Sequence, residues 1–266
     1  MISKLKVSYV THKGKVRSNN QDSIRIDSIL VNSSQTDRPR FIEVNIGSGI
    51  WLAVADGLGG HGSGEIASGV AISAIGKIKD HDLISFNQSS IAQLLLNEFQ
   101  ARPEFGDANT NMGSTLSALF INQDSVYSVH VGDSRIYSLS PFQRFTKDDS
   151  LVQTLVDRGE VTESMHRFHP LKNRLTSAII ANSKAPNISV KRYSLPESPA
   201  FLLCTDGLWE NFDDTEIQGK FDQLFQIDNA TNRQNSQLQD FANWLFFTTL
   251  ERGANDNLTF IVATLH

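Results

Sequence analysis

Val54-Ala55-Asp56-Gly57-Leu58-Gly59-Gly60-His61-Gly62-Ser63-Gly64-Glu65 joins two segments of different character. Before it, the apolar run from Ile50 to Ala55 predicts a buried strand that stops at an acid. After it, apolar residues recur every four positions from Ile66 to Ile78, which predicts a helix over 64–79 with one face in a core. The glycines permit positive φ angles and a close approach of the backbone to a ligand. The stretch is therefore either an ordinary strand–turn–helix junction or a ligand-binding turn.

The composition limits the class of protein. The 266 residues suffice for one large domain or two small ones, and no repeat, low-complexity tract or linker divides them, so we predict a single domain over 1–266. The net charge of −5, with no long block of like charges, argues against nucleic acid or an anionic membrane as the main partner. No signal peptide, no run of about 18 apolar residues and one cysteine, Cys204, together predict a cytoplasmic protein without a membrane span.

Strand-like runs neighbour one another along the chain instead of alternating with helices. We expect strands at 1–11, 23–31, 46–55, 114–122, 125–131, 136–139, 188–193, 200–205 and 258–265. Helices are expected at 64–79, 89–101, 151–158 and 213–225, and a last one runs through Leu238 and Phe246. This order favours an α+β fold of mainly antiparallel sheets with helices packed outside. The polar segment 162–173 is expected to be a mobile cover and not core.

Carboxylates stand at the ends of the strand-like runs, at Asp22, Asp56, Asp133, Asp206 and Asp256. Any one of them could simply make a turn, where aspartate is common. Together they can converge at one rim of a sheet, where they would repel one another and raise each other's pKa unless cations neutralise them. An all-oxygen set of ligands without cysteine favours a hard ion, Mg²⁺ or Mn²⁺.

The Val54–His61 segment, with Gly64-Glu65 and Ala67-Ser68, resembles the signature of bacterial metal-dependent protein serine/threonine phosphatases, the PPM family. Further blocks follow in the order of that family: Arg17–Asp22, Gly113-Ser114-Thr115, Val131–Tyr137, Thr146–Ser150, His169-Pro170, Leu202–Trp209 and Asp256–Thr259. The resemblance covers about residues 8–265. It implies one catalytic domain folded as a four-layer α-β-β-α sandwich, with two mainly antiparallel sheets flanked by helices.

The resemblance also implies a site for two metal ions, Mn²⁺ or Mg²⁺. Asp56 would bridge them, the backbone carbonyl of Gly57 would bind one, and Asp206 and Asp256 would hold the other. Asp22 would take part directly or through water. A hydroxide shared by the two ions would attack phosphorus in line, without a phosphoenzyme.

Three more residues take roles from the resemblance. Arg17 matches the arginine that binds the phosphoryl group, and His61 matches a histidine that serves either as general acid or as a hydrogen-bonding member of the loop. Asp133 would hold a weaker third metal, or would be a turn acid paired with Arg135. Two positions depart from the pattern. Gln21 replaces a common glutamate, and Glu210 stands where some relatives have an aspartate near the third metal.

The expected activity is hydrolysis of phosphoserine and phosphothreonine in proteins, which would reverse the action of a bacterial serine/threonine kinase. The segment Thr146–Ile180 matches the variable flap beside the site, where we expect substrate choice to reside. The alternative from another class is a catalytically weak regulatory module that binds phosphorylated proteins; Gln21 and Glu210 favour it. A two-metal phosphodiesterase shares the ion chemistry but lacks the basic surface that nucleic acid needs. The oligomeric state is not readable from the sequence.

Overall fold

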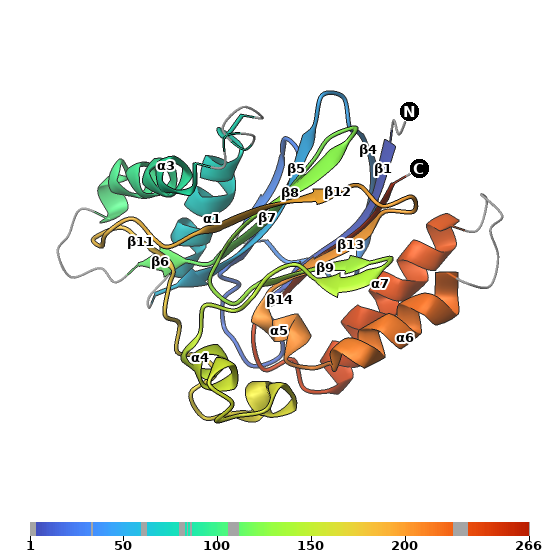
Figure 1. Ribbon diagram of the computed structural model, residues 1–266. Helices are drawn as coiled ribbons and strands as arrows, with labels where there is room; N and C mark the ends of the chain where they lie inside the picture. Colours follow the sequence, from blue (N-terminus) through green and yellow to red (C-terminus); the bar gives the residue numbers. More distant parts are fainter. Residues whose placement is uncertain are drawn as a thin grey trace.

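Two β-sheets pack face to face, and helices cover both outer faces in the computed structural model (Figure 1). The structure describes residues 4–32, 34–59, 63–79, 83, 85, 87–105, 112–225 and 234–265. The predicted α+β fold and its four layers are confirmed.

All pairings in the first sheet are antiparallel. Its strand order is β10 (Phe142–Arg144), β9 (Arg135–Leu139), β13 (Ala200–Cys204), β14 (Leu258–Leu265), β1 (Lys4–His12) and β4 (Arg40–Asn45). The outer face of this sheet packs on α6 (Asp214–Phe225) and α7 (Gln234–Glu251) through a core that includes Phe241 and Phe260.

The pairings in the second sheet are antiparallel as well. Its main order is β11 (Ile179–Ile180), β6 (Gly113–Ser114), β5 (Ile50–Leu58), β7 (Leu116–Ile121), β8 (Ser125–Val131) and β12 (Ser189–Ser194). Off this path, β2 (Asp22–Ile26) pairs with β5 and with β3 (Ile29–Asn32). The helices α1 (Ser63–Ile75) and α3 (Gln88–Gln100) cover its outer face.

The strand β5 shows why the sequence builds layers. Trp51 and Ala53 belong to the core under α1, whereas Leu52 and Val54 belong to the core between the sheets. Successive side chains of a strand point to opposite faces, so an unbroken apolar run is what a strand needs when both of its faces are buried.

Short elements complete the chain. The 3₁₀ helix η1 (Pro103–Phe105) follows α3, and the others are α4 (Leu151–Asp157), the 3₁₀ helix η2 (Glu163–Phe168) and α5 (Asp206–Trp209). In Figure 1, α4 lies at the lower end of the molecule, below α5. Ser150 caps α4 by accepting a hydrogen bond from the backbone N–H of Gln153.

Some predicted boundaries are wrong. The run 23–31 is the hairpin β2–β3 and not one strand, since Asp27 turns the chain with φ +53°. The strand predicted from 46 begins at Ile50, because Gly47 and Gly49 make a turn after β4. The segment 162–173 is not all cover, because His166 is buried. Among the described residues, no helix is long and apolar enough to cross a membrane.

Candidate metal centre

The predicted acids come from both sheets and gather at one end of the sandwich. Asp22 and Asp56 face each other directly in the β2–β5 pairing of the second sheet. From the first sheet, Asp206 opens α5 one residue after the end of β13, and Asp256 precedes β14. A cleft of about 250 Å³ lies between the two groups, and Asp133, from the turn after β8, reaches it as well, whereas Asp22 is buried and is not among its lining residues. The described lining residues are Arg17, Gln21, Asp56, Gly57, Leu58, Gly59, Asp133, Asn173, Leu175, Asp206, Asp256 and Asn257.

Two glycines let the backbone close in around these acids. A Cβ on Gly57 would lie 1.9 Å from the carbonyl oxygen of Gly64, at the start of α1. A Cβ on Gly207 would lie 1.9 Å from the carbonyl oxygen of Asn257. Each glycine directly follows an acid of the cleft, so its missing side chain lets the backbone at that acid approach neighbouring backbone of its own layer closely.

Burial and mutual repulsion disturb the carboxylates strongly. Burial raises the pKa of Asp22 to about 7, and burial together with the nearby Asp148 and Glu210 raises the pKa of Asp133 to about 7. The pKa values of Asp56 and Asp206 also lie well above the usual range, through burial and the charges of the neighbouring aspartates. A bound cation would offset the repulsion among these carboxylates and favour their charged forms.

Asp22 offers an oxygen for such a cation. Its Oδ2 accepts a 2.9 Å hydrogen bond from the Thr205 hydroxyl, whereas its Oδ1 is buried without a hydrogen-bond partner among the described residues. Within the described chain, no three acidic, histidine or cysteine side chains already form a closed metal site. The candidate ligand atoms are all carboxylate or carbonyl oxygens, and the carboxylates repel one another. One of them, Oδ1 of Asp22, has no hydrogen-bond partner among the described residues. The residues present therefore fit hard divalent cations.

Arg17 lies at the mouth of the cleft and pairs with one of the acids. Its Nη2 donates to Oδ2 of Asp256 at 2.6 Å, and that hydrogen bond raises the pKa of the Arg17 guanidinium. The side chain is still 53 % exposed, so the guanidinium faces solvent as well as the acid.

Asn257 holds the loop that carries Arg17, a role that the sequence did not reveal. Its Nδ2 donates to the carbonyl oxygens of Lys13 and Asn19, at 3.0 and 2.8 Å. Its Oδ1 accepts from the backbone N–H of Gln21 at 2.8 Å. The sequence signals were its place directly after Asp256 and its membership of the block Asp256–Thr259.

The structure resolves some of the alternatives left by the sequence. Arg135 pairs with Asp148 and not with Asp133, so the predicted Asp133–Arg135 pair is wrong. Gln21 donates through Nε2 to the carbonyl oxygen of Gly59 at 3.1 Å, and Glu210 pairs with Lys172. His61 lies outside the described residues.

The family profile described as "Protein phosphatase 2C" matches residues 32–245. The chain belongs to the protein phosphatase 2C family. Members of this family are metal-dependent. Among its relatives, the chain is 29% identical over 257 residues to the serine/threonine protein phosphatase PstP of Mycobacterium tuberculosis. That match covers 94% of this chain and 43% of PstP, so the chain spans less than half the length of this relative. It is also 29% identical over 222 residues to the protein phosphatase PhpP of Streptococcus pneumoniae, covering 80% of this chain and 83% of PhpP.

Solved structures of bacterial phosphatases share the fold over nearly the whole chain. The crystal structure of the M. tuberculosis phosphatase PstP/Ppp superposes with a TM-score of 0.73 at 28% identity, covering 98% of both chains. A structure of the PstP catalytic domain in complex with two manganese ions gives a TM-score of 0.70 at 28% identity, covering 98% of this chain and 99% of that one.

Proposed function

We propose that this chain is a metal-dependent hydrolase of phosphoserine and phosphothreonine in proteins. The observation that carries the proposal is the acidic cleft, in which strand ends of both sheets present aspartates beside one arginine. Because the acids come from both sheets, neither sheet contains the cleft alone, which supports one catalytic unit over 1–266.

The residues that would hold two Mn²⁺ or Mg²⁺ ions are Asp22, Asp56, the Gly57 carbonyl, Asp206 and Asp256. When bound, such ions supply a nucleophilic water of lowered pKa and neutralise phosphoryl oxygens. Asp133 is the proposed ligand of a weaker third ion. Its neighbour Glu210 is engaged by Lys172, so the charge available for that ion is reduced.

Arg17 would orient the phosphoryl group. A planar guanidinium can give two parallel hydrogen bonds to two oxygens of a phosphate, and Arg17 is exposed at the mouth of the cleft. In the structure Arg17 pairs with Asp256, so the same guanidinium would be shared between an acid of the cleft and an incoming anion.

The proton for the leaving alkoxide has a candidate donor in His61, which stays a proposal from the family resemblance. Among the described residues no activated nucleophile competes with a water. Cys204 is buried, and burial raises the pKa of its thiol, so a covalent cysteine mechanism finds no support.

The proposed substrates are phosphorylated proteins, with reversal of a serine/threonine kinase as the biological context. The relatives PstP and PhpP are named as phosphatases, and they support this class without identifying a substrate.

The test is Mn²⁺-dependent release of phosphate from a phosphothreonine peptide by the purified chain, with Asp206→Asn as the inactive comparison. Activity that is unchanged in EDTA, or that survives in Asp206→Asn, would contradict the proposal. Tight peptide binding by the Mn²⁺-loaded protein without turnover would instead favour a phosphoprotein-binding module.

A further inference from the structure

The base of the predicted flap, Thr146–Ile180, is tied to the turn that carries Asp133. The backbone N–H of Asp149 donates to the carbonyl oxygen of Gly132 at 2.6 Å, and the Gly132 N–H donates back to Asp149 Oδ2 at 3.0 Å. Thr176 closes the other side of the base by donating to the Asp149 carbonyl at 2.7 Å.

A buried ion pair continues from this base into the body of the protein. Arg135 forms a bidentate ion pair with Asp148, in which Nη2 lies 2.7 Å from Oδ2 and Nε lies 3.0 Å from Oδ1. Both side chains are buried, and Arg135 holds the pKa of Asp148 below its usual range although burial acts to raise it. Such a carboxylate is anionic and can only accept hydrogen bonds.

The same arginine positions an indole beside the acids. The Arg135 guanidinium lies 3.6 Å from the centre of the Trp209 ring, and the indole Nε1 donates to the backbone carbonyl of Asp133 at 2.9 Å. Trp209 closes the short helix α5, which opens at Asp206. A shift of this indole therefore acts on two residues of the cleft, Asp133 and Asp206.

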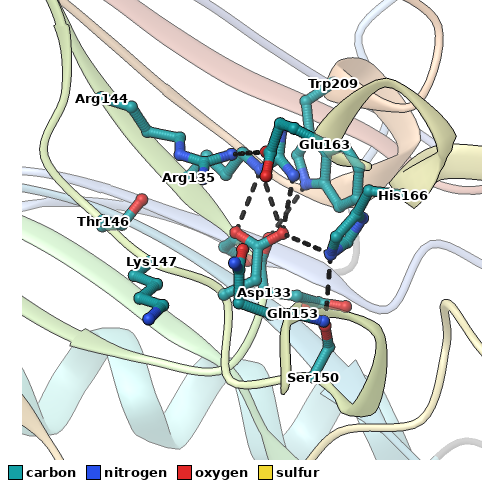
Figure 2. A network of polar contacts seen from close by, with 12 residues as sticks. Asp133, Arg135, Arg144, Thr146, Lys147, Ser150, Gln153, Glu163, His166 and Trp209 are labelled. Atoms are coloured by element: carbon teal, nitrogen blue, oxygen red, sulfur yellow. Dashed lines mark hydrogen bonds and ion pairs between the residues drawn. The ribbon is translucent and has the colours of Figure 1, made fainter. Parts of the chain in front are cut away.

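His166 reaches this network from the interior of the flap (Figure 2). It is 2 % exposed, and its Nε2 lies 3.5 Å from Asp148 Oδ2 and 3.3 Å from the Ser150 hydroxyl oxygen. Its ring meets Trp209 edge-on at 5.6 Å. The flap is also tied from outside, where Arg144 pairs with Glu163 at 2.7 Å.

The protonation of His166 follows from these partners. The hydrogen-bond partner of Nε2 is the Ser150 hydroxyl, and the anionic Asp148 carboxylate 3.5 Å away favours a hydrogen over a lone pair on the same nitrogen. Its Nδ1 is buried without a hydrogen-bond partner among the described residues, so a second N–H there would be left unsatisfied. The imidazole is therefore neutral, with a single N–H that lies between the Ser150 hydroxyl and the Asp148 carboxylate at the base of the flap.

We propose that His166 is a positioning residue that links the packing of the flap to the geometry of the acidic cleft. It restrains the Asp148 carboxylate and abuts Trp209, and these two contacts set the position of the indole, of the Asp133 carbonyl and of α5. A flap that shifts over a substrate thereby alters the metal-binding acids. The inference rests on the proposed function only through the Mn²⁺ site whose affinity is measured.

The test separates a role of the His166 N–H as a hydrogen-bond donor from a role of the side chain in packing. His166→Gln keeps an N–H near the place of Nε2, whereas His166→Leu keeps volume without a donor. His166→Asn also keeps an amide but falls short of Asp148. Met165→Ala is the matched control, because Met165 is 54 % exposed on the same 3₁₀ helix.

Two readouts need no turnover. The first is the indole N–H resonance of Trp209 in the metal-free protein, assigned with Trp209→Phe, because it reports the hydrogen bond to the Asp133 carbonyl. The second is the affinity for Mn²⁺ by calorimetry. We expect His166→Leu and His166→Asn to move the resonance and to weaken Mn²⁺ binding by about 3- to 10-fold, whereas His166→Gln and Met165→Ala match the wild type.

Equal Mn²⁺ affinity and an unmoved resonance in His166→Leu would overturn the inference. A loss of Mn²⁺ affinity in His166→Gln as large as that in His166→Leu would also overturn it, because the N–H donor would then be irrelevant. If His166→Leu does not fold, the comparison of His166→Gln with His166→Asn decides. Should the wild type bind Mn²⁺ but release no phosphate, the proposed function fails and this inference stands or falls separately.

Discussion

Arg17 donates a 2.6 Å hydrogen bond to Asp256 at the mouth of the acidic cleft, joining a residue of the N-terminal loop to one that precedes the last strand. The pair places the cleft's exposed guanidinium directly beside its acids. This geometry gives Arg17 two roles. Its guanidinium offsets the negative charge of Asp256 among the other acids, and it remains available to bind an anion.

Replacement of Arg17 tests the second role. We expect Arg17→Ala to reduce kcat/KM for a phosphothreonine peptide on the order of 100-fold, as the loss of a charged donor to the transferred group does in other enzymes. Arg17→Lys should restore only part of it, because an ammonium cannot fork two oxygens. Lys15→Ala on the same loop, where the side chain is exposed, is the control and should match the wild type. Wild-type kcat/KM in Arg17→Ala would show that Arg17 only balances Asp256.

The raised pKa of Asp22 makes the stability of the metal-free protein depend on pH. An acid whose pKa rises from 3.8 to about 7 on folding binds more protons in the folded state, so its contribution to stability falls as pH rises between these values. Asp22→Asn removes this loss. In EDTA at pH 8 we expect the variant to be more stable than the wild type by roughly 2–4 kcal/mol, and at pH 4 nearly equal to it.

Urea unfolding of both proteins at the two pH values measures the difference. The buried His130, whose pKa burial lowers to about 4, has the opposite pH dependence, but it is common to both proteins and cancels. A stability difference that does not change with pH would contradict the prediction. Saturating Mn²⁺ should reverse the order at pH 8, because the ion binds the wild-type carboxylate.

The sequence was sufficient for the layers and for the acids. Apolar runs that end at Asp56 and Asp206 predict buried strands with carboxylates at their ends, and the pairing of β2 with β5 then sets Asp22 opposite Asp56. The hairpin β2–β3 was missed because its turn has neither glycine nor proline, and Asp27 adopts positive φ instead. The edge strand β4 was missed because its mixed polar and apolar residues carry no clear period.

The links between distant residues could not be predicted. His166 lies in a polar segment and is buried only because Asp148, Ser150 and Trp209 surround it in the folded chain. Asn257 contacts a loop 236 or more positions earlier, a pairing that no local pattern encodes.

The Asn257 contacts lead to a third prediction. Asn257→Ala removes three hydrogen bonds from a side chain that is 5 % exposed, so we expect a loss of about 1–3 kcal/mol in unfolding free energy. Because the freed loop carries Arg17, KM for the phosphopeptide should rise more than kcat falls. Chemical unfolding and steady-state kinetics measure both effects. Asn97→Ala on the exposed face of α3 is the control, and a stability loss with unchanged KM would show that the loop positions Arg17 without Asn257.

Lys172 provides a fourth prediction. Its ammonium pairs with Glu210, whose charge acts on the acids around Asp133 and Asp206. Lys172→Met leaves Glu210 uncompensated, so we expect the weakest Mn²⁺ site to bind about 2- to 5-fold more tightly. The double variant Lys172→Met/Glu210→Gln should lose this gain. Calorimetric titration of the three proteins checks the expectation, and identical isotherms would place Glu210 outside the influence of any bound ion.

Gly207 carries the last prediction, which concerns the turn between β13 and α5. A Cβ there would lie 1.9 Å from the Asn257 carbonyl oxygen, and backbone atoms cannot give way as a flexible side chain can. Gly207→Ala must therefore push α5 away from β14, at a cost of about 2–3 kcal/mol in unfolding free energy. Asp206 moves with α5, so Mn²⁺ affinity should fall in the molecules that still fold.

Gly219→Ala is the matched control, because nothing lies within 4 Å of its Cβ position in the interior of α6. An alanine at a free helical position should stabilise the protein by roughly 0.5–1 kcal/mol. Opposite signs for the two glycine-to-alanine changes are the expected result, and equal effects would contradict the close contact between Gly207 and Asn257.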